Sequence, residues 1–395
     1  MAHIAFFAPS AAGHINPTLG MVAELTARGH RVTYATTPVY AERVAEAGAE
    51  IVHFDTTIAP PPDKPFKLSG VDLSRGLLAN LRETRTVFPK LLPFYERNTP
   101  DLVIFDGIAA WWGRLIAQKL GVPCMPDWTT FVSNSEWSLM GPYIKPNPFD
   151  LRLWGFAIGM QRLASKAKLT MAELVDGTGT GVRGQLVFMP RSFQFAQESF
   201  GEEFHFIGPC LGERASQGEW QPPASGRPVC LVSLGTIYTA RPEFFADVIK
   251  AFTGSKWHVV LAVSDRVDRS LLGKIPENIE IHSAVPQMAI LPHTDLFINH
   301  AGITSVMEAV HFGVPMIAVP QMVEQRATAD RMEAVNIGRH LPPEKVTVDV
   351  LRKLIDEVSE DQSIKDSLVT FKKELDEAGG TTAAVKIIEE VVGTP

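Results

Sequence analysis

The sequence predicts an α/β fold of two domains, each built on a parallel β-sheet. Short apolar runs alternate with helical segments from the amino terminus onward, and the same alternation begins again at residue 229. Alternation of this kind is typical of parallel sheets joined by right-handed helical crossovers. A chain of 395 residues also exceeds the usual size of a single domain. We therefore expect two domains of about 150 to 200 residues each.

The first domain is expected over residues 1–208. Asn16 is predicted to cap the first helix, because Pro17 suits the first helical position, where a missing N–H costs little. The resulting alternation predicts a Rossmann-like layer. We expect strands at residues 3–8, 31–36, 51–54, 102–105, 123–128, 186–189 and 204–207, and helices through residues 19–25, 41–47, 77–92 and 112–120.

Three segments look irregular. Residues 56–73 are rich in proline and longer than a usual connection, which predicts a functional loop. Residues 131–182 are rich in aromatic residues and methionine but show little periodicity, so we expect mobile helices there. Residues 209–228 contain several glycines and prolines and are predicted to link the two domains.

The second domain is expected over residues 229–378, followed by a final segment at 379–395. Because Gly379 and Gly380 interrupt the helical pattern, we expect the last helix to turn back onto the first domain. We expect strands at residues 229–234, 258–263, 279–285, 296–298 and 316–319, and helices at 242–252, 348–358, 364–375 and 381–392.

Composition limits the class of partner. A net charge of −7 argues against broad binding to nucleic acid or to anionic membranes. Cys124, Cys210 and Cys230 are too widely spaced for a zinc motif, so we expect buried thiols. The amino terminus lacks both the basic segment of a signal peptide and an apolar span of about 20 residues. We expect a cytoplasmic enzyme, a monomer or weak homodimer, that acts on metabolites and needs no membrane.

The strongest binding pattern follows the fourth strand of the second domain. His300 and Gly302 come directly after that strand, where a small residue lets a ligand approach the backbone. Thr304 and Ser305 suit the start of a helix, whose unpaired N–H groups attract phosphate. Glu308 lies one turn beyond Ser305, and its carboxylate can accept hydrogen bonds from a vicinal diol such as ribose. The alternatives are a packed histidine, a simple helix cap and a solvated glutamate.

A second pattern lies near the first strand. His14 follows a glycine at the carboxyl edge of the predicted sheet, where active sites of open α/β sheets form. A histidine can remove a proton from an attacking hydroxyl if another group holds its ring in the right tautomer. Asp106 follows the strand at 102–105 and is placed to be that group. The alternative is that each of the two residues caps a helix.

Several motifs together resemble one enzyme family. The pattern His-x-Gly-x-x-Ser-x-x-Glu, followed by a proline-bounded strand and Glu-Gln, is similar to the donor-binding signature of family 1 nucleotide-sugar glycosyltransferases. The resemblance covers essentially the full chain and is closest to bacterial macrolide and flavonoid UDP-glycosyltransferases. It also includes Val285-Pro286-Gln287, Ala12-Gly13-His14-Ile15-Asn16-Pro17, Ser233-Leu234-Gly235-Thr236 and the Glu-Ala-Gly-Gly sequence that ends at Gly380.

The resemblance implies a GT-B fold, in which two Rossmann-like domains face each other across a cleft, with the acceptor on the amino side and the nucleotide sugar on the carboxyl side. It implies that His14 is the catalytic base and that Asp106 orients it. The donor contacts that it implies are Thr236, His300, Gly302, Thr304 and Ser305 around the diphosphate, Glu308 at the ribose, Val285 and Gln287 at the nucleobase, and Glu324 and Gln325 at the sugar hydroxyls.

The expected reaction inverts the anomeric centre and uses no bound metal or other cofactor. The sequence has no Asp-x-Asp motif, so backbone amides, His300 and a helix dipole would stabilise the leaving diphosphate. Attack opposite an α-linked diphosphate would give a β-glycoside. UDP-glucose is the expected donor. Three departures from the family pattern bear on donor choice: Ala284 stands where many relatives have an aromatic residue, Thr304 where others have Asn, and Glu324 where Asp is commoner.

The acceptor pocket is predicted from clustered aromatic residues in the first domain. Such residues usually fill hydrophobic cores, which is the alternative interpretation. Their position after Asp106, in the least periodic segment, still favours an apolar pocket for a flat or macrocyclic aglycone such as a flavonoid or macrolide. The candidate acceptor-binding residues are Phe66, Trp111, Trp112, Phe131, Trp137 and Met140.

Other functions remain as alternatives. A dTDP-sugar-dependent antibiotic glycosyltransferase would share every motif above. A nucleotide-sugar epimerase would need no large acceptor pocket, and a nucleotide-sugar-binding protein without turnover would need no base. A NAD oxidoreductase and a serine hydrolase are disfavoured, because the first strand is not followed by Gly-x-Gly-x-x-Gly and the chain has no Gly-x-Ser-x-Gly.

Overall fold

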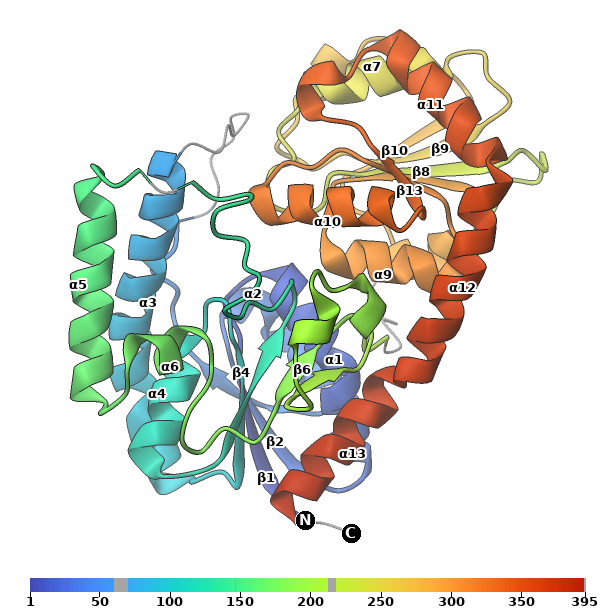
Figure 1. Cartoon of the computed structure of the whole chain (residues 1–395). Helices are drawn as coiled ribbons and strands as arrows, with labels where there is room; N and C mark the ends of the chain where they lie inside the picture. The colour runs from blue at the N-terminus through green and yellow to red at the C-terminus, as the bar shows by residue number, and fades with distance from the viewer. Residues whose placement is uncertain (60–69, 146, 212–217, 394–395) are drawn as a thin grey trace. The chain divides into compact units, whose positions relative to one another are not determined.

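The computed structural model describes residues 1–59, 70–145, 147–211 and 218–393. These residues form two compact units. The first contains the described residues up to 211 together with those from 378 onward, and the second contains the described residues from 218 to 377. Each unit is an α/β structure with a parallel sheet at its centre (Figure 1).

The first sheet has seven parallel strands in the order β3-β2-β1-β4-β5-β6-β7. The chain moves outward from β1 to β3 and then returns to start β4 on the other side of β1, so the strand order reverses between β1 and β4. The strands are β1 (His3–Phe7), β2 (Arg31–Thr36), β3 (Glu50–His53), β4 (Leu102–Asp106), β5 (Cys124–Trp128), β6 (Gln185–Val187) and β7 (Phe204–Phe206).

Both faces of this sheet are covered by helices, and β1 is buried along its whole length for that reason. Ile4 and Phe6 pack into the hydrophobic cluster on one face, and Ala5 and Phe7 pack into the cluster on the other. The alternation follows from the two-residue period of a strand. The covering helices are α1 (Ala12–Ala27), α2 (Pro38–Glu46), α3 (Gly70–Arg97) and α4 (Trp111–Leu120).

The first helix begins earlier than the sequence predicts. Its N-cap is Ala11, and Pro17 lies inside the helix, so the prediction that Asn16 caps it is wrong. The amides of His14 and Ile15 both donate to the carbonyl of Ala11, at 3.1 Å each, which starts the helix directly after β1. As a consequence His14 lies in the first helical turn and not in a preceding loop.

The segment after β5 contains two helices, α5 (Leu151–Lys166) and α6 (Met171–Val175). Asp150 caps α5 by accepting from the amide of Arg152 at 3.0 Å. Thr170 forms a capping box with Glu173 at the start of α6. Helix α5 lies beside α3 (Figure 1). The predicted loop at residues 56–73 lies largely outside the described residues, and α3 begins at residue 70.

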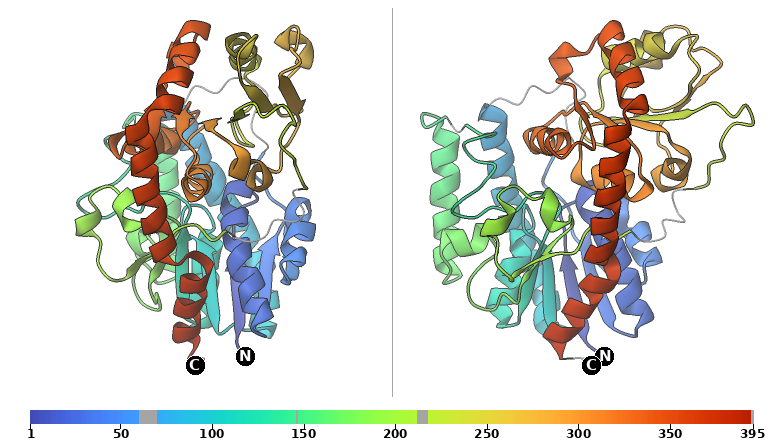
Figure 2. Two further views of the ribbon diagram at one scale, coloured as in Figure 1. Left: turned by 90° about the vertical axis from the view of Figure 1, so that its right-hand side faces the viewer. Right: turned by 45° about the vertical axis from the view of Figure 1, so that its right-hand side comes forward.

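The last helix, α13 (Gly380–Val392), belongs to the first unit, as the sequence predicts. Helix α13 packs beside α1 (Figure 2). Its residues Ala384, Val385 and Ile388 are buried in the same cluster as residues of α1. The break before α13 needs glycine: the amide of Gly380 donates to the carbonyl of Ile207 at 2.7 Å, and its φ of 50° is left-handed. This contact fixes where the chain rejoins the first unit.

The second sheet has six parallel strands in the order β10-β9-β8-β11-β12-β13, so its strand order reverses between β8 and β11. Strand β13 was not predicted from the sequence, and β10 ends three residues earlier than predicted. The strands are β8 (Val229–Ser233), β9 (His258–Ala262), β10 (Ile279–His282), β11 (Leu296–Asn299), β12 (Met316–Ala318) and β13 (Gly338–His340).

Helices cover both faces of the second sheet as well. Helices α7 and α11 lie on one face, and α9 and α10 lie on the other (Figure 1). The sequence analysis did not predict α10. The helices of this unit are α7 (Pro242–Phe252), α8 (Gln287–Ile290), α9 (Ile303–Phe312), α10 (Val323–Ala334), α11 (Val348–Glu360) and α12 (Gln362–Ala378).

The three cysteines are free and buried, as predicted. Burial raises the pKa of Cys124 to about 11 and that of Cys210 to about 12, so both thiols stay protonated at neutral pH. Among the described residues, no helix combines the length and the apolar character that a membrane span requires.

Candidate active site

In the first unit, His14 and Asp106 lie at the reversal point of the sheet. Strands β1 and β4 are neighbours, with Phe7 paired to Phe105, so the chain after β1 and the end of β4 meet at one edge. Open α/β sheets bind ligands at the carboxyl edge where the strand order reverses. The fold therefore brings together two residues that are 92 positions apart.

His14 and Asp106 are hydrogen-bonded. Nδ1 of His14 lies 2.6 Å from Oδ2 of Asp106, whose side chain is fully buried, while that of His14 is 24% exposed. The other carboxylate oxygen of Asp106 accepts from the amides of Ile108 at 3.1 Å and Ala109 at 2.8 Å. Amide donors stabilise the ionised form of a carboxyl group, so Asp106 is held as a carboxylate acceptor.

This geometry assigns the tautomer of His14. A carboxylate has no proton to donate, so Nδ1 must carry the proton of the hydrogen bond. In the neutral ring the lone pair is then on Nε2, the nitrogen on the far side of the ring from Asp106. Thr129, which follows β5, adds its hydroxyl oxygen at 3.3 Å from Nδ1. The sequence analysis did not select Thr129, because it has no motif of its own and reaches the site only through the strand order.

The predicted acceptor residues divide into two groups. Trp111 and Trp112 are buried in α4, where Trp111 packs against Phe156 at 6.0 Å between ring centroids and Trp112 against Phe54 at 5.7 Å. Their indoles lie in two of the hydrophobic clusters of this unit. The core-packing interpretation therefore accounts for both rings.

Phe131 and Trp137 belong to an aromatic cluster after β5. The ring centroids of Phe131 and Trp137 are 5.6 Å apart, and Phe195 stacks on Trp137 at 5.0 Å with an interplanar angle of 11°. Phe193 stacks on Phe131 at 5.9 Å. Met140 is exposed. The sequence analysis missed Phe193 and Phe195, because they follow β6 and join the cluster only through the fold.

Phe66, the remaining predicted acceptor residue, lies outside the described residues.

In the second unit, the residues predicted to contact the diphosphate follow β8 and β11, between which the strand order reverses. Asn299 at the end of β11 is paired with Ser233 at the end of β8. The backbone turns two residues beyond each of these positions, where Gly235 has a φ of 79° and Ala301 a φ of 59°. The backbone therefore turns sharply after β8 and after β11, and α9 starts directly after the second of these turns.

His300 is enclosed by two glycines. A Cβ atom on Gly235 or on Gly302 would lie 2.6 Å from Nε2 of His300, so only glycine leaves room for the ring at both positions. Burial lowers the pKa of His300 to about 4, although a hydrogen bond with the backbone of Ser233 opposes part of this shift. The imidazole is therefore neutral at physiological pH and has one N–H, which it can donate to an anion in place of the backbone of Ser233.

Helix α9 begins at Ile303, one or two residues earlier than the expected start at Thr304 or Ser305. Its N-cap is Gly302, with no side-chain cap, so the proposal that Thr304 or Ser305 caps the helix is wrong. Both residues lie inside the first turn. The helix presents its unpaired backbone amides at the end of β11, and amides in this position bind phosphate.

Three predicted donor residues contact one another. Nε2 of Gln287 donates to Oε2 of Glu308 at 2.5 Å and to Oγ of Ser305 at 3.3 Å. Glu308 is buried, which excludes the alternative that it is a solvated helix residue. Val285, half-buried, precedes this cluster, and its carbonyl accepts from the amide of Gln287 at 2.9 Å. The two residues predicted to bind the nucleobase therefore adjoin the residue predicted to bind the ribose.

Glu324 and Gln325 lie in the first turn of α10. The side-chain oxygen of Gln325 accepts from the amides of Gln321 at 2.8 Å and Met322 at 3.1 Å, which closes the turn before the helix. A sugar contact by Gln325 would therefore use its amide nitrogen. Thr236 is exposed in the loop after β8.

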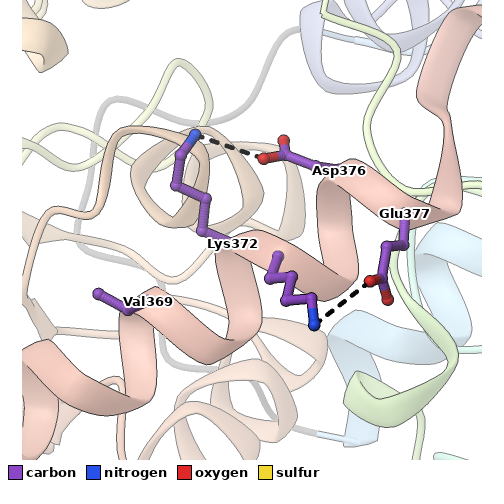
Figure 3. Close-up of a pocket in the computed structure, with 5 residues that line it drawn as sticks. Val369, Lys372, Asp376 and Glu377 are labelled. Atoms are coloured by element: carbon purple, nitrogen blue, oxygen red, sulfur yellow. Dashed lines mark ion pairs between the residues drawn. The ribbon is translucent and has the colours of Figure 1, made fainter.

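A surface cavity of about 460 Å³ lies elsewhere, on α12 (Figure 3). Val369 lines it, together with the ion pairs of Lys372 with Asp376 at 3.8 Å and Lys373 with Glu377 at 3.7 Å. It contains none of the predicted site residues, and its exposed pairs are ordinary helix pairs at i,i+4 spacing. Within the described part of the chain, no three His, Cys, Asp or Glu side chains are grouped closely enough to hold a metal ion.

Comparison with known proteins agrees with these motifs. The sequence profile of the C-terminal domain of erythromycin biosynthesis protein CIII-like proteins matches residues 248–391. The chain is 36% identical to the NDP-glycosyltransferase YjiC of Bacillus subtilis (strain 168) over 393 residues, which cover 98% of this chain and 96% of YjiC. It is also 36% identical to the demethyllactenocin mycarosyltransferase of Streptomyces fradiae, over 98% of this chain and 86% of that protein.

Solved structures show the same fold. The glycotransferase of kitacinnamycin superposes with a TM-score of 0.89 at 32% identity, covering 99% of both chains. The calicheamicin glycosyltransferase CalG4 gives 0.85 at 30% identity, covering 100% of this chain and 98% of that one. These likenesses confirm the predicted fold class and the predicted enzyme class. The chain belongs to the macrolide and flavonoid type of bacterial family 1 glycosyltransferases, which have the GT-B fold.

Proposed function

We propose that this glycosyltransferase transfers a hexose, first of all glucose, from a UDP-sugar to a hydroxyl of a hydrophobic small molecule, with inversion and without a metal ion. The observation that carries the proposal is the 2.6 Å contact between Nδ1 of His14 and Oδ2 of Asp106 at the carboxyl edge of the first sheet. This contact gives an imidazole whose Nε2 can accept a proton and whose positive charge is then stabilised by a buried carboxylate.

The proposed step has a simple balance of bonds. Nε2 of His14 takes the proton of the acceptor hydroxyl while its oxygen attacks the anomeric carbon of the sugar. The bond from that carbon to the diphosphate oxygen breaks, and UDP leaves with the electron pair. A single displacement of this kind inverts the anomeric centre, so an α-linked donor gives a β-glycoside. A phenol, with a pKa near 10 as in tyrosine, is an easier nucleophile for a histidine base than an aliphatic alcohol.

The second unit supplies the groups that would bind the nucleotide sugar. The backbone amides at the start of α9, the hydroxyls of Thr236 and Ser305, and the neutral ring of His300 would receive the diphosphate, where hydrogen-bond donors stabilise the developing charge. Glu324 and the amide nitrogen of Gln325 would contact the sugar hydroxyls. None of these hydrogen bonds to the nucleotide sugar depends on a metal ion.

The buried carboxylate of Glu308 supports UDP as the donor. A ribose presents two neighbouring hydroxyls, whereas the deoxyribose of dTDP presents one, so a carboxylate that accepts from both favours UDP. Gln287 donates to one oxygen of Glu308 at 2.5 Å. The bound diol would take over that hydrogen bond and turn Gln287 toward the nucleobase.

A dTDP-sugar remains the second candidate donor. The solved glycosyltransferases VinC and SpnG, each in complex with thymidine diphosphate, share this fold with TM-scores of 0.72 and 0.75, although at 20% and 18% identity. Ala284, which is exposed beside Val285, offers no ring to stack on a base and so does not itself select uracil over thymine.

For the acceptor, we propose an apolar pocket that includes the cluster of Phe131, Trp137 and Phe195. Stacked and edge-on rings of this kind bind flat apolar molecules well. Flavonoids and macrolides are the acceptor classes that we expect, with tolerance for several members of each.

The test uses pairs of donors and acceptors. The protein is incubated with UDP-glucose or dTDP-glucose and with quercetin or a macrolide aglycone, and products are identified by mass and by the NMR coupling of the anomeric proton. We expect a gain of one hexosyl unit in β-linkage, faster with UDP-glucose, and unchanged by a metal chelator. An α-linked product, or activity lost on chelation, would contradict the inverting, metal-independent reaction.

A further inference from the structure

A second aspartate adjoins the His14–Asp106 pair and has no part in the reaction described above. Asp127 on β5 is paired in register with Asp106 on the neighbouring strand β4. Residues in register on adjacent parallel strands point to the same face of the sheet. Both side chains are buried, with exposed fractions of 0% for Asp106 and 1% for Asp127. Two buried carboxyl groups therefore occupy one face of the sheet next to the proposed base.

The two carboxyl groups differ in their hydrogen bonds. Asp106 accepts from the ring of His14 and from the amides of Ile108 and Ala109. Oδ1 of Asp127 is buried and has no hydrogen-bond partner among the described residues. Hydrogen-bond donors favour the ionised form of a carboxyl group, and a buried carboxylate without donors is costly. One of the two sites is thus built for a carboxylate, and the other is not.

The electrostatic surroundings of Asp127 agree with this difference. Burial raises the pKa of Asp127 well above its usual range, and the negative charge of Asp106 raises it further. Asp127 also interacts electrostatically with Tyr34 on β2 and with Cys210, and burial raises the pKa of each, so both are uncharged.

We propose that Asp127 is protonated in the wild-type protein, so that Asp106 and Asp127 share a single negative charge, which moves to Asp127 when Asp106 is neutralised. The proposal rests on the proposed role of His14 as the base. In the wild-type protein Asp127 is neutral, so Asp106 carries the only negative charge of the two beside the imidazole. A second charge would hold the proton on His14 more tightly and delay its return to solvent after each turnover.

The charge state can be measured without any assay of activity. Aspartate labelled with ¹³C at its carboxyl carbon gives one resonance for each side chain, and the Asp127 resonance is identified by its loss in Asp127→Asn. At pH 7 we expect the shift of a protonated carboxyl for Asp127 and of a carboxylate for Asp106. Two carboxylate resonances would overturn the proposal, whether or not the protein transfers glucose. If Asp127→Asn does not fold, backbone correlations assign the resonance in the wild-type protein.

A double-mutant cycle tests the movement of the charge. Asp127→Asn alone should change kcat by less than about threefold at pH 7, because a neutral amide replaces a neutral acid of the same shape. In the Asp106→Asn background, Asp127 loses the repulsion of its neighbour and can ionise beside His14. The remaining activity should then rise with pH as Asp127 ionises. The second substitution, Asp127→Asn, should lower that activity by a further factor of about ten or more.

Equal effects of Asp127→Asn in the two backgrounds would overturn the proposal, since a purely structural carboxyl would give that result. Asp101→Asn is the matched control. Asp101 precedes β4 and accepts from the amide of His3 on β1 at 2.7 Å, at the opposite edge of the sheet, so Asp101→Asn should leave both the kinetic cycle and the Asp127 resonance unchanged. If His14→Ala retains full activity, the proposed function fails, but the resonances still decide the charge state.

A stability measurement gives a third readout. A buried acid with a raised pKa binds its proton more tightly in the folded state than in the unfolded state. Its contribution to stability is present at low pH and is lost as the pH rises from the unfolded pKa through the folded one. The urea midpoint of Asp127→Asn should therefore improve relative to wild type as the pH rises from 5 to 8. A difference that stays constant over this range would contradict a protonated Asp127.

Discussion

The reversal points of the two sheets have the same topology but different chemistry. At the first, between β1 and β4, a buried carboxylate holds the imidazole of His14 through Nδ1. At the second, between β8 and β11, the imidazole of His300 is enclosed by Gly235 and Gly302 and has no carboxylate against it in the described contacts. The strand order determines where a site forms, and the neighbours of each histidine determine what it does.

The difference is one of proton affinity. Asp106 stabilises the protonated form of His14, which a base must reach during the reaction. Burial without a counter-charge lowers the pKa of His300 to about 4, which keeps that ring neutral. A neutral ring donates a hydrogen bond to a diphosphate but does not exchange protons with it near neutral pH. The two histidines thus suit two tasks, proton transfer and anion binding.

Removing His14 should have the largest effect. His14→Ala is expected to lower kcat for an aliphatic alcohol acceptor about 10²- to 10⁴-fold, because general-base catalysis contributes a factor of this size. The affinity for UDP-glucose, measured by calorimetry, should stay within about twofold, since the donor residues belong to the second unit. His53→Ala removes an exposed histidine at the end of β3 and serves as the control. A variant that keeps its full rate would remove His14 from the role of base.

Removing the charge of Glu308 should affect donor binding next. Glu308→Gln is expected to raise the KM for UDP-glucose about tenfold, because hydrogen bonds to a charged acceptor are the strong ones. The loss should be smaller with dTDP-glucose, whose sugar lacks one of the two hydroxyls. Equal losses with both donors would separate Glu308 from the ribose. Glu357→Gln, on the exposed surface of α11, is the matched control.

Filling the space beside His300 should have a smaller effect. Gly235→Ala places a Cβ atom 2.6 Å from Nε2 of His300, and we expect a three- to tenfold loss of affinity for UDP-glucose, as for one hydrogen bond. Gly254→Ala is the control, because Gly254 has a similar φ of 72° but open space around its Cβ position. Both variants carry the cost of an alanine at positive φ, so both should lower the urea midpoint. A lower affinity of Gly235→Ala than of Gly254→Ala for UDP-glucose then reports the displacement of His300 alone.

The pH dependence of donor binding should be the smallest effect. Because the pKa of His300 is about 4, its ring stays neutral between pH 6 and 8, and the affinity for UDP-glucose should change by less than about twofold over that range. A histidine with the usual pKa of about 6.5 would bind the diphosphate more tightly as the pH falls to 6. Tighter binding at pH 6 would show that the ring is protonated in the complex.

The same pKa predicts a loss of stability in acid. A folded pKa below the unfolded value contributes stability that is present above the unfolded pKa and is lost as the pH falls through the folded pKa. Between about pH 6.5 and 4 the unfolded chain binds a proton at this position and the folded chain does not. The urea midpoint of the wild-type protein should therefore fall more steeply over this range than that of His300→Gln.

Most strands could be predicted because their signal is local. The apolar runs at β1, β4, β8 and β11 are buried on both faces, and such strands are almost continuously apolar, with polar residues mainly at their ends. The missed elements lack that signal. Strand β13 consists of Gly338, Arg339 and His340, and α10 carries few apolar residues, so neither differs from a loop in composition. The first helix was placed too late because Pro17 is tolerated inside it, against the usual preference.

The position of the candidate site could be predicted from the sequence, but most contacts between its residues could not. The residues that follow β1, β4, β8 and β11 had to lie at the carboxyl edges of parallel sheets, which selected His14, Asp106 and His300. Aromatic composition could not separate Trp112, which fills the core, from Trp137, which stacks in a half-buried cluster. Asp127 carried no motif and was passed over.

The sequence by itself determined the alternation of strands and helices, the two domains and the types of residue at the sheet edges, because periodicity and turn chemistry act over a few neighbouring residues. Only the tertiary structure decided that Asp106 meets His14 and lies beside Asp127, and that Gln287 donates to Glu308. These partners are far apart in the chain and are joined by the order of the strands. Their burial, which sets the proton affinity of each group, depends on everything that packs around them.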